Sequence, residues 1–177
     1  MNFPEICTPW SAAWRPEFVG ALLFVRRGDE VLLIEKKTGH GAGKINGPGG
    51  KIQSGESVLE CAIRETREET GVCASEVSCR IEMRFVELDG PQWLGFGCVA
   101  QAFRGNPVNT READPFWCDI SQLPFSRMWP DDAIWLPEIL KRDPGPPLVG
   151  NFLFEHGRLL AHEFVSEPSI WQDFPLG

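Results

Sequence analysis

A glycine-rich stretch followed at once by an amphipathic segment restricts most strongly what this chain can fold into. Residues 38–50, TGHGAGKINGPGG, hold too much glycine for a helix or a central strand and predict a loop. Residues 57–70 predict a helix, because suitable side chains recur at spacings of three and four at Val58, Leu59, Ala62, Ile63 and Thr66. Gly71 supplies a helix stop. The sequence therefore predicts a loop–helix unit.

Three glutamates on the predicted helix lie where helix electrostatics disfavour them. Glu65, Glu68 and Glu69 are spaced i, i+3 and i+4, so they share one face near the negative end of the helix dipole. The like-charged Glu65/Glu69 pair alone costs about 0.2–0.5 kcal/mol. A bound Mg²⁺ or Mn²⁺ ion would reverse this penalty, since hard cations prefer carboxylate oxygens. The alternative interpretation is a solvated acidic face balanced by Arg64 and Arg67.

The glycine-rich loop is not a Walker-type phosphate loop. Neither Lys44 nor Lys51 is followed by serine or threonine, and the glycine spacing is wrong. The loop still offers backbone carbonyls and amides beside the same helix. A site shared by the loop and the glutamates is the prediction that follows.

The loop and the helix together carry a motif. Reading from Gly50, five residues separate it from Glu56, and seven more precede the run RETREETGV at 64–72. This spacing resembles the Nudix box, Gx5Ex7REUxEExGU, and all seven of its fixed Gly, Glu and Arg positions match. Seven such matches have a chance probability of about 10⁻⁹ per starting position. Thr66 stands where the family prefers an aliphatic residue.

The resemblance implies a fold, a reaction and a set of residues. The implied fold is an α/β (α+β) sandwich with a mixed β-sheet between helices, and the reaction is hydrolysis of a nucleoside diphosphate linked to another group. Mg²⁺ is the implied cofactor, with Mn²⁺ possible. The metal ligands would be the carbonyl of Gly49 and the carboxylates of Glu65, Glu68 and Glu69. Arg64 would orient Glu65, and Glu56 would support the site from the loop.

Two strings outside the box bear on the substrate. GAGKINGPGGK contains Asn46, and PFSRMWPDD contains Trp129, Asp131 and Asp132. Both resemble the MutT-type purine nucleoside triphosphatases that remove oxidised bases from the nucleotide pool, especially the animal branch. Glu112 falls where that branch has an additional catalytic glutamate, which would also bind metal.

The chemistry of these residues suits a purine base. An asparagine amide both donates and accepts, an indole offers a stacking face, and adjacent carboxyls can share a proton. The alternatives are that Trp129 is core, that Asp131 and Asp132 cap a helix, and that Asn46 is a turn residue.

Some positions depart from the family pattern near the base site. His40 stands where the family has a phenylalanine, Ile45 replaces a tryptophan, and Pro48 replaces another aromatic residue. His40 and Lys36 complete the predicted substrate-binding set. These departures leave the preferred base open.

The function predicted from these motifs is Mg²⁺-dependent cleavage of oxidised or methylated purine (deoxy)nucleoside triphosphates, such as 8-oxo-dGTP or 2-hydroxy-dATP, to monophosphate and pyrophosphate. One alternative is another Nudix substrate, such as ADP-ribose, a dinucleoside polyphosphate or an RNA 5′ end. The other is a nucleotide-binding module that does not hydrolyse. The four box glutamates argue against the latter, because such modules usually lose them.

Composition limits the partners. The 177 residues carry 17 Lys and Arg against 25 Asp and Glu, and the net charge of −8 disfavours nucleic acid polymers and anionic membranes. No apolar run is long enough to span a membrane. A cytoplasmic monomer or weak dimer acting on a small nucleotide is therefore expected. Reduced and mostly buried thiols are expected at Cys7, Cys61, Cys73, Cys79, Cys98 and Cys118.

Three parts of the chain are expected. Residues 1–17 form an irregular extension whose Trp10 and Trp14 dock on the domain, residues 18–165 the hydrolase domain, and residues 166–177 a tail. Within the domain, hydrophobic patterns predict a hairpin over 18–37, strands at 80–87, 93–103 and 115–120, a helix at 131–142 and a closing hairpin over 151–167.

Overall fold

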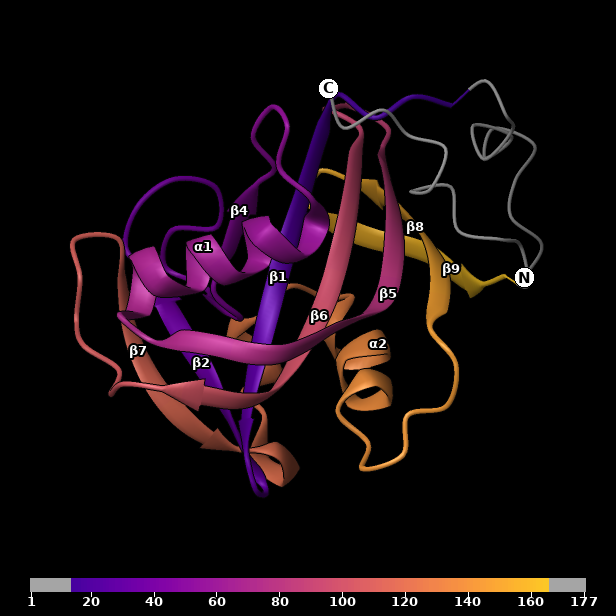
Figure 1. Cartoon of the computed structure of the whole chain (residues 1–177). Coiled ribbons are helices and arrows are strands. Elements are labelled where there is room, and N and C mark those ends of the chain that lie inside the picture. The colour runs from indigo at the N-terminus through magenta and orange to yellow at the C-terminus, as the bar shows by residue number, and fades with distance from the viewer. Residues whose placement is uncertain (1–13, 166–177) are drawn as a thin grey trace.

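A mixed sheet organises the molecule. The structure, a computed structural model, describes residues 14–165, and within them nine strands form one sheet of order β3-β2-β1-β6-β5-β8-β9, with β4 on β1 and β7 on β2 (Figure 1). The pairs β1/β6 and β5/β8 are parallel and the others antiparallel. The strands are β1 (Phe18–Arg27), β2 (Glu30–Lys36), β3 (Ile45–Asn46), β4 (Gly49–Lys51), β5 (Cys73–Glu87), β6 (Trp93–Arg104), β7 (Ala113–Asp119), β8 (Leu148–Glu155) and β9 (Arg158–Phe164).

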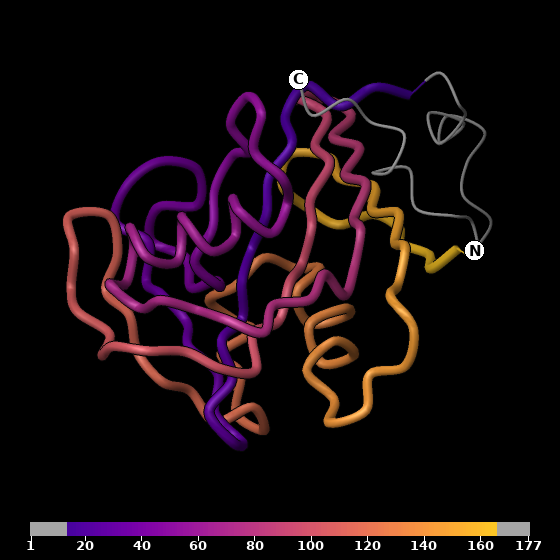
Figure 2. Tube along the Cα trace, in the orientation of Figure 1, coloured from indigo at the N-terminus to yellow at the C-terminus, as the bar shows by residue number. Residues whose placement is uncertain are grey.

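Two hydrophobic cores lie on opposite faces of the sheet, each with one helix. Side chains of β1 alternate between them, so Leu23 and Val25 join the core of α1 (Val58–Thr70), whereas Phe24 joins that of α2 (Asp132–Ile139). The chain leaves β1, passes through β2, β3, β4, α1 and β5, and then runs as β6 beside β1, as the trace in Figure 2 shows. The predicted α/β class, with a mixed sheet between helices, is confirmed.

A glycine lets α2 approach the sheet closely. A Cβ atom at Gly97 of β6 would lie 2.6 Å from Ile81 and 3.2 Å from the ring of Trp135. Trp135 is almost fully buried on α2 and also meets the Phe24 ring edge-on, at 5.7 Å between centroids. Because Gly97 has no side chain, Trp135 packs closely on β6 and sets the position of α2 on the sheet. Asp131 and Asp132 lie at the start of this helix.

Local contacts set the ends of α1. The hydroxyl of Ser57 accepts from the backbone N–H of Glu60 and the Glu60 carboxylate accepts from that of Ser57, which forms a capping box. Gly71 ends the helix at φ 76°. Thr66 is buried, and its hydroxyl donates to the carbonyl of Ala62 at 2.8 Å. That bond explains how a threonine is accommodated at the position where the family prefers an aliphatic residue.

The structure corrects several predicted boundaries. Residues 38–50 are not all loop, because β3 and the start of β4 lie within them. The strand predicted at 80–87 begins at Cys73, where it pairs with the far end of β6. The helix predicted over 131–142 ends at Ile139. The backbone N–H of Leu140 makes the last helical hydrogen bond, to the carbonyl of Leu136. The carbonyl of Lys141 accepts from the side chain of Arg26.

The remaining expectations have mixed outcomes. Trp14 is buried in the core under α1, whereas Trp10 and Cys7 lie outside the described residues. The described cysteines are free thiols, but only Cys61 and Cys98 are buried, so the expectation of mostly buried thiols is wrong. Across residues 14–165, no helix has the length and apolar character needed to span a membrane.

Candidate active site

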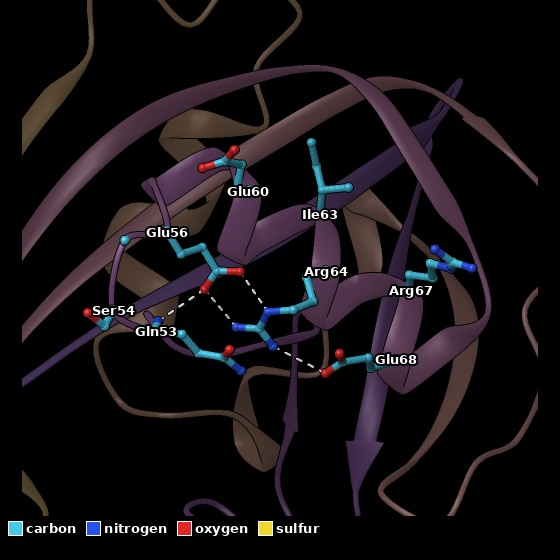
Figure 3. Close-up of a pocket in the computed structure, with 9 residues that line it drawn as sticks. Gln53, Ser54, Glu56, Glu60, Ile63, Arg64, Arg67 and Glu68 are labelled. Carbon is cyan, nitrogen blue, oxygen red and sulfur yellow. Dashed lines mark hydrogen bonds and ion pairs between the residues drawn. The ribbon is translucent and has the colours of Figure 1, made fainter. Parts of the chain in front are cut away.

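Arg64 draws three glutamates together on the exposed side of α1. Its guanidinium binds both oxygens of Glu56, at 2.6 and 2.8 Å, and reaches Glu68 at 3.1 Å (Figure 3). It also reaches Glu65 at 2.7 Å. The hydrogen bond from Arg64 lowers the pKa of Glu56, so this carboxylate stays ionised. The cluster borders a surface cavity of about 700 Å³, lined by Gln53, Ser54, Gly55, Glu56, Glu60, Ile63, Arg64, Arg67 and Glu68.

Glu69 faces the glycine-rich loop and is almost fully buried. Its carboxylate accepts from the backbone N–H of Gly49 at 2.9 Å and from the ammonium of Lys36 at 3.0 Å. Burial raises the pKa of Glu69, while the charge of Lys36 and the bond from Gly49 act in the opposite direction. Lys36 therefore balances a carboxylate that lies 33 positions further along the chain.

Two glycines shape the loop around the glutamates. The Lys36 ammonium also donates to the carbonyl of Gly49 at 3.3 Å, so a positive group lies between two of the predicted metal ligands. A Cβ atom at Gly50 would lie 2.4 Å from the carboxylate of Glu65. Glycine at position 50 thus leaves the space that this carboxylate occupies.

These residues fit a hard divalent cation by their chemistry. Gly49, Glu65, Glu68 and Glu69 supply only oxygen donors, which Mg²⁺ prefers, and a positive group already lies against two of them. Across the described part of the chain, however, no three His, Cys, Asp or Glu side chains converge as a ready metal cluster. The carboxylates are paired with Arg64 and Lys36 instead.

Glu112 lies on an exposed loop that is tied to the end of α1. The hydroxyl of Thr110 donates to the backbone carbonyl of Glu69 at 3.1 Å and accepts from the backbone N–H of Glu112 at 3.2 Å. The backbone carbonyl of Glu112 also accepts from the backbone N–H of Lys37 at 2.8 Å. These bonds hold the backbone of Glu112 near the C-terminal end of α1. Thr110 was missed from the sequence, because a lone threonine in a polar loop carries no motif.

A second group of residues surrounds the start of α2. Asp131 and Asp132 are buried, with 4% and 1% of their surface exposed. Asp131 accepts from the indole N–H of Trp135 at 2.8 Å, and Asp132 accepts from the backbone N–H of Trp129 at 2.9 Å. Burial raises the pKa of Asp131 to about 6, and burial together with the Asp131 charge raises the pKa of Asp132 well above its ordinary value. The pair can therefore hold a proton near neutral pH.

The raised pKa of Asp131 predicts a pH-dependent stability. A carboxyl whose pKa is higher in the folded than in the unfolded chain stabilises the fold fully below pH about 4, and this contribution is lost as the pH rises through 6. Asp131→Asn should therefore gain about 2 kcal/mol of unfolding free energy over the unsubstituted chain between pH 4 and 8. Urea titrations across that range measure it, with exposed Asp143→Asn as control. An equal offset at every pH would contradict the expectation.

The other predicted base-site residues lie in different local settings. Trp129 is half-buried rather than part of the core, and the ammonium of Lys44 lies 4.7 Å from its ring centroid. The side-chain carbonyl of Asn46 accepts from the backbone N–H of Gly47 at 2.8 Å, as a turn residue would. His40 is exposed and stacks on Trp129, with 5.1 Å between ring centroids. His40 and the aspartates thus both border Trp129.

Two aromatic residues near this group were not singled out from the sequence. Trp93 stacks on His40, with 5.3 Å between ring centroids, and packs at a tilt against Phe18, at 4.7 Å. Phe18 and Trp93 are the first residues of β1 and β6 and are paired in the sheet. Only the parallel pairing of these two strands, which local patterns do not encode, brings them together.

Comparison with known proteins identifies the family and relatives of this chain. The NUDIX domain model matches residues 15–139. An oxidized purine nucleoside triphosphate hydrolase from Danio rerio is 35% identical over 144 residues, which cover 80% of this chain and 90% of the relative. The enzyme of that description from Mus musculus is 34% identical, covering 76% and 85%. The crystal structure of a MutT protein from Bacillus halodurans superposes with a TM-score of 0.72 at 25% identity, covering 85% of this chain and 99% of that one.

Proposed function

This chain belongs to the Nudix hydrolase family, and from that premise we propose that it cleaves oxidised or methylated purine nucleoside triphosphates to the monophosphate and pyrophosphate. The observation that supports this substrate is the buried pair Asp131 and Asp132 next to Trp129, whose indole is half-buried. The related enzymes from Danio rerio and Mus musculus act on oxidised purine nucleoside triphosphates. In this role the protein removes damaged nucleotides from the pool.

Divalent metal ions such as Mg²⁺ generally serve this family, and we assign Mg²⁺, or alternatively Mn²⁺, to the glutamates of α1. The ligands in this proposal are the carbonyl of Gly49 and the carboxylates of Glu65, Glu68, Glu69 and Glu112. A metal ion held by these ligands would supply positive charge against the phosphates and against the charge that develops on the pyrophosphate leaving group.

The other residues position and balance these carboxylates. Arg64 holds Glu65 and Glu68 at one side of its guanidinium while Glu56 neutralises the other. Lys36 lies 3.0 Å from Glu69 and carries the positive charge that a phosphate would meet on entry. Keeping these groups in place before substrate arrives lowers the reorganisation that the reaction requires.

In this proposal the base is bound by Asn46, Trp129, Asp131 and Asp132. Trp129 offers a stacking face, and the Asp132 carboxylate is fixed to its backbone by a 2.9 Å bond. Because the pKa of each aspartate is raised, one carboxyl can donate to a base edge while the other accepts. Such a pair suits purines whose substituents differ in donor and acceptor pattern.

A substrate panel tests the proposed function. Pyrophosphate release with Mg²⁺ is measured for 8-oxo-dGTP, 2-hydroxy-dATP, O6-methyl-dGTP, N6-methyl-dATP and the four ordinary dNTPs, with ADP-ribose and a dinucleoside tetraphosphate as other Nudix substrates. Ranking by kcat/KM should place a modified purine first. Preference for ADP-ribose or the dinucleotide would keep the family and discard this substrate.

Gly50→Ala should weaken metal binding far more than it weakens the fold. The added Cβ would lie 2.4 Å from the Glu65 carboxylate, which is the far end of a flexible side chain and can move aside. We expect the affinity for Mn²⁺ to fall about tenfold, as for a disturbed metal-supporting residue, with little change in Tm. Calorimetric titration with Mn²⁺ measures it. Gly55→Ala controls for a lost glycine beside the same carboxylates, because its Cβ would meet open space and its cost is confined to backbone strain at a φ of 79°. Unchanged Mn²⁺ affinity in Gly50→Ala would remove Glu65 from the ligand set.

A further inference from the structure

The imidazole of His40 joins two tryptophans that come from distant parts of the chain. Its ring is nearly parallel to that of Trp93, at 21° and 5.3 Å between centroids, and to that of Trp129, at 14° and 5.1 Å. His40 belongs to the loop between β2 and β3, Trp93 begins β6, and Trp129 lies just before α2. Both indoles are half-buried. A flat ring at this position therefore contacts two aromatic faces at once.

The two indoles are held from other sides, independently of His40. Phe18 packs on Trp93 at 4.7 Å, and the ammonium of Lys51 lies 3.6 Å from the Phe18 centroid and 5.3 Å from that of Trp93. The ammonium of Lys44 lies 4.7 Å from the centroid of Trp129. These contacts keep both indoles in place when the ring of His40 is absent.

The His40 ring itself is uncharged and weakly anchored. Partial burial, followed by the charges of Lys36 and Lys51, lowers its pKa below the ordinary value, so the ring is neutral at pH 7. It is flanked by Gly39 and Gly41, whose φ values of 73° and 83° lie in the left-handed region. A Cβ atom at Gly39 would meet open space. A neutral ring held by stacking can leave the indoles by rotation of its side chain, while the backbone bonds from Ala42 to Gly39 and from Lys44 to Gly41 keep the loop in place.

We propose that Trp93 and Trp129 are the two stacking faces of the base site, and that the His40 ring is a placeholder which the purine base of the substrate displaces. This inference rests on the proposed function and deepens it. The displaced position contacts the ring of Trp129, and the backbone N–H of the same residue donates to Asp132, so Trp129 connects a base there to the buried aspartates. The charge of Lys36 lowers the pKa of His40, and its ammonium donates to Glu69. Lys36 therefore lies between the base position and the glutamates, and the phosphates of the same nucleotide can extend toward them.

Displacement makes His40 a competitor of every base. The apparent affinity is the intrinsic affinity multiplied by the fraction of molecules whose site is open. His40→Ala should therefore tighten binding of 8-oxo-dGMP about three- to tenfold and leave that of pyrophosphate unchanged. Trp93→Leu should weaken 8-oxo-dGMP binding about fivefold or more, because one stacking face is lost, whereas Trp93→Phe should retain most of it.

Calorimetry and NMR of the full chain test the proposal. Dissociation constants of 8-oxo-dGMP, dAMP and pyrophosphate are measured for the unsubstituted chain and the three variants, with exposed His162→Ala as the matched histidine control. The ring proton signals of His40 should start upfield, shielded by two indoles, and move downfield as 8-oxo-dGMP is added, while those of His162 stay constant.

The possible outcomes separate this inference from the proposed function. Weaker 8-oxo-dGMP binding in His40→Ala, or His40 signals that do not move, would show that His40 is part of the site and not a placeholder. Unchanged affinity in Trp93→Leu would remove Trp93 from the site. Equal affinity of the unsubstituted chain for dAMP and 8-oxo-dGMP, together with tighter binding of both by His40→Ala, would keep the placeholder and discard the preference for modified purines.

Discussion

Glu68→Gln is expected to lower kcat for pyrophosphate release with Mg²⁺ by at least about 100-fold while leaving the fold intact. In the proposed site, the Glu68 carboxylate is a metal ligand, and an amide is a much poorer ligand for a hard cation. The side chain is 55% exposed and meets Arg64 at 3.1 Å, so its removal costs the fold no more than about 0.5 kcal/mol. Activity and stability should therefore separate cleanly in this variant.

The matched control is Glu60→Gln. Glu60 lies on the same helix and lines the same cavity, and glutamine preserves the capping box because it also accepts from the N–H of Ser57. Steady-state rates over a range of Mg²⁺ concentrations, with Tm measured alongside, compare the two variants. A near-normal rate in Glu68→Gln would remove this carboxylate from the metal site. Equal losses in both variants would assign the defect to the cavity surface.

The loop–helix unit could be predicted from sequence because the interactions that define it are local. Ser57 and Glu60 cap α1 three residues apart, Gly71 stops it, and Arg64 meets Glu65 and Glu68 within one turn. The misplaced charge of the three glutamates was likewise visible, since it follows from helix periodicity alone. The pairing of Glu69 with Lys36, across 33 positions, was not, because nothing in the spacing encodes which strand passes beneath the helix.

The proposed base site was harder to predict, because its residues come from distant parts of the chain. Trp129 and the two aspartates are neighbours in sequence, so their string could be recognised. Trp93 and His40 join Trp129 only through strand pairing and loop placement. The missed first half of β5 has a different cause. Glu76 adopts φ 53° there and interrupts the alternation by which strands are recognised, although Cys73 and Ala74 still pair with β6.

Asp131→Asn is expected to reduce discrimination for the base by about 10–100-fold, the range for losing a hydrogen bond to a charged group in a buried site. The carbonyl of asparagine can still accept from the indole N–H of Trp135, now accepted by Asp131 at 2.8 Å, so α2 keeps its position on the sheet. The amide cannot share a proton with Asp132. The ratio of kcat/KM for 8-oxo-dGTP to that for a bare polyphosphate should fall accordingly.

The bare polyphosphate makes this experiment decisive, because it meets the glutamates of α1 without presenting a base. Asn46→Ala should lower the same ratio, whereas Asp143→Asn, an exposed change of the same chemistry, should leave it unaltered. A parallel loss on both substrates in Asp131→Asn would mean that the aspartate supports the hydrolytic end of the site or the fold. A loss confined to 8-oxo-dGTP assigns the buried carboxyl to reading the base, since the bare polyphosphate presents no base for a protonated carboxyl to contact.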